Sequence, residues 1–575
     1  MCGLVGIVGE GVSLDDARRM LALVRHRGPD DEGVYQADRA CLGHVRLAIV
    51  DPSPAGAQPM TTPDGRYCLV YNGELYNHGD FRLDLTQRGV TFRGHSDTET
   101  LLWLLVHYGE SILPRLNGIF AFALLDTWSG RLLLARDHLG VKPLYYTQTA
   151  RGRLLFASEI KALFATGEVE PRANVDDLAE LFMFHFIAGA RTAFAAVDEL
   201  KPGHALTYAH GVMTLRRFWS PIPAEHHTGA GLDESLDRLL AAGVQRQLMA
   251  DVPIGIMSSG GVDSGVVTAL AHGERSGFCF RDPQYGYDEF EQARQLSEAF
   301  GVSVEEVRID PADMPDLLMK LTWHHDEPIP RPHHLAAFAI SRQARAQGLK
   351  VLVSGEGGDE IFGGYARYVD IAADMDRSGD STALVFGHNR VAVPRLARFW
   401  SRTHFANDYR FLCARETEGF DHINRQLFVD QQTFLQHFLQ RADRMGMAAG
   451  VEIRVPLLDI DVVEHVNGLP GRCKIADGRT KLCLKAAMRG TLPQAVLDRP
   501  KQAFELPMSP LLCAGPVAGL VNDLLLAHPR CGALFDEVEI HRLVHDFRQG
   551  DSELWKMVWL LLTTEIWMRT FNVSA

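Results

Sequence analysis

This chain of 575 residues lacks a basic excess, because its formal net charge at pH 7 is -14. General nucleic-acid binding is therefore disfavoured, since a surface that follows a phosphate backbone needs clustered Lys and Arg. No apolar run reaches the roughly 18–20 residues that span a bilayer. The first residues carry no basic region followed by a long apolar stretch, so no secretory signal is expected. These absences predict a cytoplasmic protein with neither a nucleic-acid nor a membrane partner.

Cysteine is sparse and scattered. The nine cysteines form no CxxC pair, which argues against a zinc knuckle and against a disulfide framework. Unpaired cysteines fit a reducing compartment. Internal repeats, low-complexity segments and the Walker A sequence GxxxxGKS are also missing, so a P-loop nucleotide site is not expected.

The chain is too long for one hydrophobic core, so two or more domains are expected. Residues 1–219 are strand-rich, with turn residues between short apolar runs, and few helices. This pattern predicts an α+β domain in which sheet packs on sheet. The expected strands are 41–50, 67–76, 119–126 and 131–137, and the expected helices are 14–25 and 97–108.

Apolar periodicity is lost over 216–231, and we place a linker at 220–231. Residues 232–575 then alternate between helix and strand, which predicts an α/β domain with a doubly wound parallel sheet. Residues 365–440 read as helical without further indication. The expected helices are 232–250, 262–271, 289–300 and 336–348, and the expected strands are 252–259, 304–309 and 350–355.

Cys2 is a candidate nucleophile because removal of the initiator Met would make it the first residue. Its own α-amino group, with a pKa near ~8, could then serve as the general base that a thiol nucleophile needs. Position alone is also compatible with an accidental cysteine. The downstream motifs are therefore needed to decide between the two interpretations.

Five blocks follow Cys2 in a fixed order. They are HRGPDDEG (26–33), GHVRLAIVD (43–51), YNGELYN (71–77), SDTET (96–100) and GIFAFALLD (118–126). Together they resemble the N-terminal-nucleophile glutamine amidotransferases, and in particular the glutaminase domain of asparagine synthetases, over residues 1–219. The resemblance implies a sandwich of stacked antiparallel sheets flanked by helices, with Cys2 as the catalytic residue.

The resemblance also implies a glutamine site. Arg46 would bind the α-carboxylate as a bidentate fork, and Asp97, helped by Glu74, would hold the α-ammonium. Asn72 and the Gly73 N–H would form an oxyanion hole. The segment Leu47, Ala48, Ile49 and Val50 would line the site.

Taken singly, three of these residues have simpler interpretations. Arg46 could form a surface ion pair, and Asn72-Gly73 is first of all a hairpin-turn sequence. Asp97 could be a helix cap.

A glycine-rich loop, SGGVDS, connects an expected strand to an expected helix at Ser259–Ser264. Two glycines allow close approach of the backbone to a ligand, and the helix N-terminus offers free N–H groups to an anion. The loop resembles that of the ATP-pyrophosphatase superfamily, which implies AMP and pyrophosphate as products; alone, it could be an ordinary strand-to-helix turn. The implied ATP-binding residues are Ser258, Ser259, Gly260, Gly261, Asp263, Ser264, Phe280, Ser354 and Gly355.

A second loop, SGEGGDE at 354–360, resembles a segment of asparagine synthetases. Loops at the carboxyl ends of parallel strands share one crevice, so this loop and SGGVDS should face each other. Asp263 and Asp359 are then candidate Mg²⁺ ligands, because carboxylate oxygens suit a cation that bridges phosphates. Glu356 is a candidate for a catalytic or substrate contact. For Asp359 and Glu360 the alternative is charge at a helix start.

Two blocks nearer the C-terminus, 443–459 and 479–504, extend the resemblance. It implies that Lys501 stabilises departing pyrophosphate. Lys481, Lys485 and Arg489 follow an i, i+4, i+8 spacing, which predicts one helical face that is either phosphate-facing or solvated. For Arg454 two roles stay open: a contact with substrate or a structural contact.

The resemblance implies an enzyme that uses ATP and Mg²⁺ to convert a carboxylate to an acyl-adenylate, from which ammonia derived from glutamine displaces AMP. Aspartate is the expected acid and asparagine the expected product. Residues 327–341, Gly265 and Ala503 differ from the asparagine-forming pattern, so another acid in a specialised pathway is the alternative. The family arrangement also implies an ammonia passage between the domains, and a homodimer is the assembly considered.

The same motifs disfavour three other functions. A glutamine sensor with an inactive synthetase half is disfavoured by Asp263, Glu356, Asp359 and Lys501. Sugar-phosphate amidotransferases share the Cys2 domain but have no SGGxDS loop. β-Lactam synthetases typically lack the working cysteine that is present here.

Overall fold

The computed structural model describes residues 2–222, 233–282, 288–378, 409–501 and 508–575. Met1, Ala503 and most of the linker expected at 220–231 lie outside these ranges. All nine cysteines are free thiols. Within the described ranges, no helix combines the length and apolar character that crossing a membrane requires.

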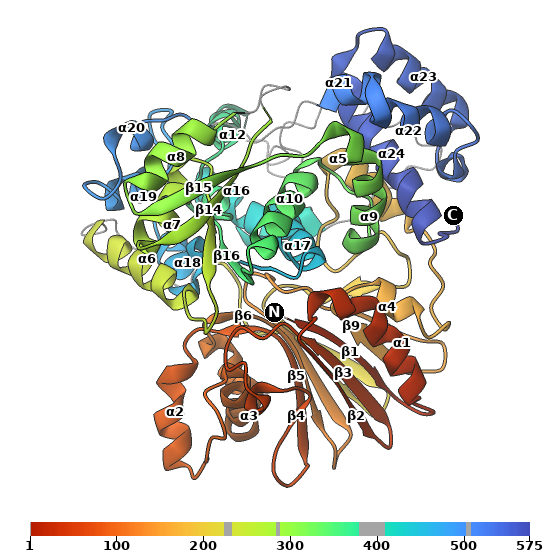
Figure 1. The fold of residues 1–575 in the computed structure, drawn as a ribbon, viewed down its shortest axis with the longest axis vertical. Coiled ribbons are helices and arrows are strands. Elements are labelled where there is room, and N and C mark those ends of the chain that lie inside the picture. The colour runs from red at the N-terminus through yellow and green to blue at the C-terminus, as the bar shows by residue number, and fades with distance from the viewer. Residues whose placement is uncertain (1, 223–232, 283–287, 379–408, 502–507) are drawn as a thin grey trace.

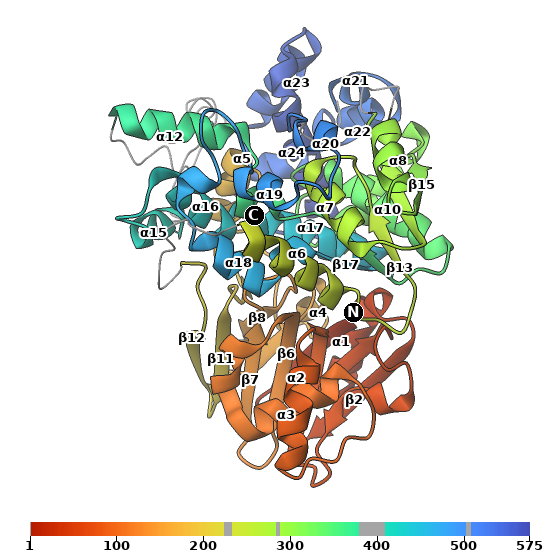
Figure 2. The ribbon, with the colours of Figure 1, turned by 90° about the vertical axis from the view of Figure 1, so that its left-hand side faces the viewer.

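Two antiparallel six-stranded sheets are stacked in the first part of the chain (Figures 1 and 2). The inner faces meet in a core that includes Leu4, Leu42, Val70 and Leu134. The first sheet has the order β10(Asp198–Glu199), β8(Tyr145–Gln148), β9(Leu154–Ala157), β1(Cys2–Val8), β3(Ala40–Arg46), β2(Asp31–Ala37). The second has the order β12(Val212–Arg217), β11(His204–Ala209), β7(Arg131–Arg136), β6(Gly118–Asp126), β5(Tyr67–Leu75), β4(Met60–Thr61).

Helices cover the outer faces of this sandwich. Helix α1 (Leu14–Val24) packs on β1 and β3, and its buried residues recur on one face, as an amphipathic helix requires. Helix α3 (Asp97–Tyr108) packs on β5, and α2 (His78–Gln87) packs on α3. The α4 (Lys161–Phe164) and α5 (Val175–Phe184) helices follow the first sheet.

A parallel five-stranded sheet forms the centre of the second part. Its strands are short, and those inside the sheet are largely buried, as is usual when helices cover both faces, whereas the edge strand β15 is partly exposed. The order is β15(Val302–Val307), β14(Arg275–Phe280), β13(Ile254–Met257), β16(Val351–Val353), β17(Glu452–Arg454). The helices before residue 379 are α6(Asp233–Gln247), α7(Val262–Ala271), α8(Phe290–Glu298), α9(Met314–His325), α10(His333–Ala346), α11(Gly358–Phe362) and α12(Ala366–Ser378).

The remaining described helices surround this sheet and extend beyond it (Figure 1). They are α15(Tyr409–Glu416), α16(His422–Gln432), α17(Phe434–Ala448), α18(Ile460–Asn467), α19(Leu482–Ala487), α20(Gln494–Leu497), α21(Met508–Cys513), α22(Gly515–Leu525), α23(Glu537–Arg548) and α24(Trp555–Thr570). Both expected fold classes are therefore confirmed: stacked antiparallel sheets are followed by an α/β parallel sheet.

The strand expected at 67–76 is confirmed as β5, and Asn72-Gly73 lies inside it, so the hairpin-turn alternative for this dipeptide is wrong. The strands β14 and β17 were not expected, and β17 has only three residues, two of them charged. Neither composition nor alternation marks such a strand, because its burial comes from tertiary packing rather than from an apolar sequence.

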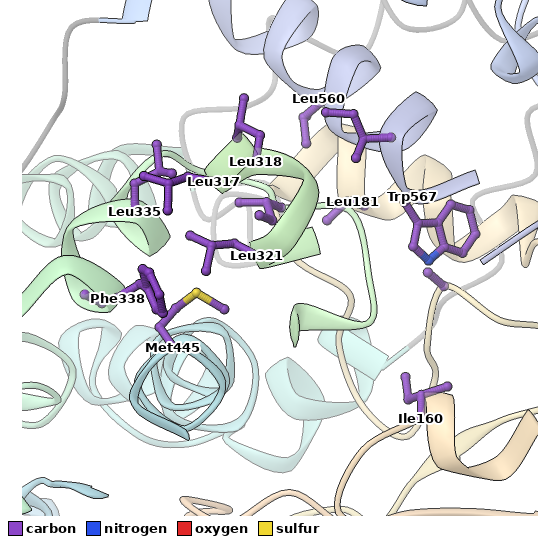
Figure 3. Close-up of a cluster of buried hydrophobic side chains, with 14 of the residues drawn as sticks. Ile160, Leu181, Leu317, Leu318, Leu321, Leu335, Phe338, Met445, Leu560 and Trp567 are labelled. Carbon is purple, nitrogen blue, oxygen red and sulfur yellow. The ribbon is translucent and has the colours of Figure 1, made fainter. Parts of the chain in front are cut away.

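The two parts share a hydrophobic core (Figure 3). Ile160 and Leu181 belong to the first part of the chain, and they lie in one buried cluster with Leu321, Met445 and Trp567 of the second. Helix α5 lies beside α9 and α24, away from the two sheets (Figure 1). A continuous apolar core of this kind restricts independent movement of the two parts more than a polar contact would.

Buried ion pairs reinforce the same boundary. Arg27 pairs with Glu159 at 3.0 Å and with Asp443 of α17 at 2.8 Å. Arg444 lies 3.2 Å from Glu159 and 3.0 Å from Asp326. Each of these side chains is at most 1% exposed. Removal of one partner would leave a buried charge uncompensated, so these pairs fix how the two parts are placed.

We predict that Trp567→Ala lowers the free energy of unfolding by about 3–5 kcal/mol, the usual cost of deleting a buried tryptophan. The Trp567 indole is fully buried, donates to the Asp326 carbonyl at 2.9 Å and packs on Phe194. Thermal unfolding followed by circular dichroism measures the change. The matched control is Trp128→Ala: this ring is 70% exposed beside Arg66, and its loss is expected to cost no more than about 1 kcal/mol. Equal shifts for both variants would contradict the prediction.

Candidate functional site

Cys2 begins strand β1 at the junction between the two parts of the molecule, where the chain start is marked in Figures 1 and 2. Its side chain is 6% exposed. The Cys2 N–H donates to the Asn72 Oδ1 at 3.0 Å, and its carbonyl accepts from the Arg27 Nε at 3.1 Å. Contacts from both sheets and from the interface thus fix this residue.

Burial raises the pKa of the Cys2 thiol, while the Leu47 backbone N–H and the Arg46 charge oppose that rise. A thiol with a raised pKa is mostly protonated at neutral pH and needs a base before it can attack. The amino group of a processed chain would supply that base. This role stays a prediction, because Met1 lies outside the described residues.

The side-chain amide of Asn72 uses its oxygen in a hydrogen bond, whereas its nitrogen has no acceptor among the described residues. Its Oδ1 accepts from Cys2, and its Nδ2 is buried. A buried donor without a partner carries a desolvation cost unless a ligand supplies the acceptor. The geometry therefore places a free donor beside the Cys2 nucleophile.

Gly73 is required by packing, since a Cβ there would lie 2.0 Å from the Ile119 carbonyl oxygen. Gly73 is opposite Phe120, whose N–H and carbonyl both bond to Asp137 on the other side of β6. In an antiparallel ladder this makes Gly73 a non-hydrogen-bonded position, so its N–H points away from β6. Such an N–H is suited to receive an oxyanion.

Arg46 ends strand β3 and is buried, so the surface ion-pair interpretation is wrong. Its guanidinium donates to the carbonyls of Val50 at 3.3 Å and Ser53 at 3.1 Å, and thereby shapes the loop that follows. Within that loop Leu47, Ala48 and Ile49 are buried and Val50 is half-buried.

The second part of the chain holds the same loop. Lys350 donates to the Ala48 carbonyl at 3.2 Å and pairs with Asp30 at 2.7 Å. The Asp251 N–H donates to the Ile49 carbonyl at 2.9 Å. The segment expected to line the glutamine site is therefore fixed from both sides of the junction.

Asp97 and Glu74 provide two buried carboxylates near Cys2. Asp97 accepts from the Leu75 N–H at 2.8 Å and the Tyr71 hydroxyl at 3.1 Å, and the N-cap of α3 is Ser96, not Asp97. Burial, and then the Asp97 charge, raise the pKa of Glu74 well above its usual value. The Glu74 Oε2 accepts no hydrogen bond from the described part of the chain.

The SGGVDS loop follows β13 and opens helix α7, as expected. Within it the Ser264 hydroxyl lies 3.0 Å from that of Ser259 and donates to the Gly261 carbonyl at 3.2 Å. Gly260 has a φ of +70°, and a Cβ there would lie 2.8 Å from the Ala293 nitrogen. The loop is therefore held open by its own hydrogen bonds and permitted by glycine.

The SGEGGDE loop follows β16 and packs directly against the first loop. A Cβ on Gly355 would lie 2.6 Å from the Asp263 carbonyl carbon. Lys481 joins the two loops, with its Nζ 2.5 Å from a carboxylate oxygen of Asp263 and 2.5 Å from one of Asp359. Lys501 lies 2.7 Å from the other Asp359 oxygen.

Two lysines decide the charge state of Asp359. Burial alone would raise the pKa of Asp359, but Lys481 and Lys501 lower it to about 2. The pKa of Asp263 is raised by burial and by the Asp359 charge, against the effect of Lys481. The buried Asp263 Oδ1 accepts no hydrogen bond from described residues. Two carboxylates with a free oxygen fit Mg²⁺, which usually takes one or two carboxylates together with substrate phosphates.

A cavity of about 440 Å³ brings these groups together. Of the expected ATP-binding residues, only Gly260 does not line this cavity. A Cβ on Gly260 would point toward Gln292 and Ala293 of α8. The sequence-predicted residues that line the cavity are Ser258, Ser259, Gly261, Asp263, Ser264, Phe280, Ser354, Gly355, Glu356, Asp359 and Lys501. Residues 327–341, which differ from the asparagine-forming pattern, contribute Arg331, His333, Ala336, Ala337 and Ile340 to the lining.

The expected helical row of Lys481, Lys485 and Arg489 is wrong. Helix α19 spans only Leu482–Ala487, and Lys481 precedes it with a φ of +56°. Lys481 and Lys485 nevertheless line the cavity, whereas Arg489 does not. Arg489 lies beyond the helix end, in an isolated bridge with Leu492.

Three contacts at the two sites were not predicted from the sequence. Arg441 of α17 pairs with Glu356 in the cavity. Arg27, inside the HRGPDD block, contacts the Cys2 carbonyl. Arg454 of β17 reaches Glu74, with 3.5 Å between Nη2 and Oε1. The block containing Arg27 was a usable signal, but neither spacing nor composition indicated the partners of Arg441 and Arg454.

Comparison with known proteins covers both parts of the chain. Residues 1–219 match a glutamine amidotransferase domain, and residues 235–569 match asparagine synthase. "Asparagine synthetase [glutamine-hydrolyzing] 3" of Bacillus subtilis (strain 168) is 33% identical over 551 residues, covering 88% of this chain and 87% of that protein.

"Amidase chyE" of Penicillium rubens is 31% identical over 581 residues, covering 85% of this chain and 84% of that protein. A glutamine phosphoribosylpyrophosphate amidotransferase structure from B. subtilis matches with a TM-score of 0.30 at 16% identity, covering 65% and 77% of the two chains. The chain belongs to the asparagine synthase family, with a glutamine amidotransferase domain preceding the synthase domain, and is a glutamine-hydrolysing ligase.

Proposed function

We propose that this enzyme uses ATP to convert a carboxylate, in the first place aspartate, to an acyl-adenylate. Ammonia released from glutamine at Cys2 then displaces AMP to form the amide. A free carboxylate is a poor electrophile, and adenylation turns one of its oxygens into part of a leaving group. We place the reaction in the cytoplasm, in keeping with the free thiols, and we consider a homodimer as its assembly.

In the first half-reaction the Cys2 thiolate attacks the side-chain amide of glutamine. The oxyanion that forms is received by the Asn72 Nδ2 and the Gly73 N–H, which are fixed before the substrate arrives. Arg46 would bind the glutamine α-carboxylate, while Asp97 and Glu74 would hold its α-ammonium. The thioester left on Cys2 is then hydrolysed to glutamate.

In the second half-reaction the Ser259–Ser264 loop would hold the pyrophosphate end of ATP, and Ser354 and Gly355 would lie near the nucleotide. Lys501 would stabilise the pyrophosphate as it leaves. Magnesium at Asp263 and Asp359 would neutralise phosphate charge. When phosphates enter, their oxygens can take over contacts that Lys481 now makes with these two carboxylates.

One observation carries this proposal. The two loops predicted to bind ATP, which are about ninety residues apart in the sequence, line one cavity together with Lys501. A sensor with an inactive synthetase half would have no need for this assembly. The aspartate reading has support from the Glu356–Arg441 pair in the cavity, since these opposite charges match the ammonium and carboxylate of an α-amino acid.

A different acid is the second candidate. The cavity wall also contains the rings of Tyr365, Phe434 and Phe438, together with Arg331 and His333. Aromatic faces beside an arginine suit a larger, ring-bearing carboxylate, while burial keeps the pKa of His333 well below its usual value and its ring neutral.

Cys2→Ala is expected to abolish glutamine-dependent amide formation while leaving synthesis from added ammonium intact. The thiol is the only reacting group that the change removes, and the nucleotide cavity contains no part of Cys2. Amide and glutamate are measured with each nitrogen source. If a folded variant loses both activities, the two sites are not separable and the prediction is wrong.

Asn72→Asp tests the oxyanion donor. The substitution keeps the Oδ1 that accepts from the Cys2 N–H but replaces the free Nδ2 by an oxygen. We expect glutaminase kcat to fall about 10²–10³-fold, as for other oxyanion-hole donors, with a much smaller change in KM. A variant with unchanged kcat would exclude Asn72 from the oxyanion hole.

ATP–pyrophosphate exchange with a panel of carboxylic acids identifies the acceptor. We expect exchange with aspartate. Label passes from pyrophosphate into ATP only when an acyl-adenylate forms and is then reversed, so exchange requires the correct carboxylate. The panel includes glutamate and ring-bearing amino and benzoic acids. Exchange with another acid, and none with aspartate, would replace the aspartate assignment and keep the mechanism; no exchange with any acid would contradict adenylation.

A further inference from the structure

Strand β17 carries two charged side chains on one face. Glu452 and Arg454 are two residues apart in a strand and therefore point the same way. Both are fully buried, and the Arg454 Nε donates to Glu452. The strand belongs to the parallel sheet of the synthase part, where Arg454 is opposite Val353 of β16.

The Arg454 guanidinium crosses the junction. Its Nη1 donates to the carbonyls of Gln247 at 2.7 Å and Met249 at 2.6 Å, which fixes the end of α6. Its Nη2 is directed to Glu74, 3.5 Å away, and makes no hydrogen bond with described residues. Arg454 is thus held by the synthase part of the chain, and its Nη2 group, which makes no hydrogen bond with described residues, faces Glu74 of the glutamine site.

Glu452 lies close enough to act on the same site. Its charge raises the pKa of both Cys2 and Glu74, whereas the Arg454 charge lowers that of Glu74. The pair therefore presents one charge of each sign to the residues around the nucleophile.

The same strand is joined to the nucleotide loop. The Arg454 carbonyl accepts from the Ser354 N–H at 2.9 Å, and Ser354 lines the nucleotide cavity. One residue consequently contacts the glutamine site through its side chain and the nucleotide loop through its backbone. A buried ion pair with a purely structural role would not need to contact both.

We propose that Glu452 and Arg454 are positioning residues of the glutamine site, contributed by the synthase part: Arg454, held by Glu452, orients the Glu74 carboxylate for the substrate ammonium. This inference rests on the proposed function, because it needs glutamine bound beside Glu74. The glutaminase site is then incomplete in residues 1–219 alone.

The charges around Glu74 determine the direction of the expected pH effects. Burial, Asp97 of α3 and Glu452 of β17 raise its pKa, and Arg454 lowers it. The neighbouring hydroxyls of Tyr71 and Tyr76 stay protonated, since burial raises the pKa of each well above its usual value. Removal of Arg454 must therefore raise the pKa of Glu74, and removal of Glu452 must lower it.

The experiment measures glutamate release from glutamine between pH 5 and 9 with the full chain. For Arg454→Gln we expect the acidic limb of kcat/KM to move upward by about one pH unit, with KM for glutamine raised about tenfold at pH 7. For Glu452→Gln the limb should move to lower pH. Arg454→Lys keeps the charge, so its limb should stay within about 0.3 units of the parent.

Arg444→Lys is the matched control. Arg444 is also fully buried at the junction, but it pairs with Glu159 and Asp326 and contacts no residue of the glutamine site. We expect an unchanged pH profile. Thermal unfolding is recorded for every variant. If Arg454→Gln does not fold, the inference is tested by the other two variants: Glu452→Gln should shift the acidic limb to lower pH, and Arg454→Lys should leave it unshifted.

Two results would overturn the inference. One is an acidic limb and a KM that stay at the parental values in folded Arg454→Gln and Glu452→Gln variants. The other is the same shift in Arg444→Lys, which would show a general response of the junction. Failure of the proposed function is distinct from both, since the parent chain would then release no glutamate from glutamine, or Cys2→Ala would still release it.

Discussion

The burial of charge at the junction between the two parts constrains the rest of the structure. Arg27, Arg444 and Arg454 are fully buried, and each must find its carboxylate partners on the other side of the junction or beside it. A charge removed from water without a partner costs several kcal/mol. A rearrangement that separates the two parts must therefore break several such pairs together, while the apolar cluster around Ile160, Leu181 and Trp567 opposes it as well. The nucleophile lies at this boundary, so its surroundings are as rigid as the junction itself.

That rigidity has a chemical use. Asn72 and Gly73 are fixed by the two sheets, so in the proposed oxyanion hole their N–H donors would act on the developing charge without reorganisation. The loop from Leu47 to Val50 is held by Arg46 on one side and by Lys350 on the other. In the nucleotide cavity, by contrast, lysines occupy the carboxylates that a metal would bind. Those contacts can exchange for phosphate oxygens, so this site is arranged to change when its ligands enter.

The fold and much of the site could be predicted because their signals are local. Helix α3 and strand β5 follow from periodicity, and the SGGVDS loop follows from glycine between an apolar strand and a helix. Residues such as Arg454, Arg441 and Lys481 could not be placed in this way. Their roles depend on partners at least 85 residues away in the sequence, and in addition on a strand of three residues for Arg454 and on a backbone turn with positive φ for Lys481. The need for glycine at position 73 could not be predicted either, because the packing against the Ile119 carbonyl that requires it is not visible in the sequence.

The difference between the two sites has a consequence for specificity. The glutamine site is built mainly from residues within the first hundred positions, and several of them are bound to one another. The wall expected to face the acceptor is assembled from separate segments, with His333 on α10, Tyr365 after α11, and Phe434 and Phe438 on α17. A substitution in any one of these segments can reshape the acceptor pocket while the glutamine site and the junction stay intact. The fold therefore allows the acid to change while the nitrogen donor remains the same, and the acceptor must be read from the side chains of this wall rather than from the fold.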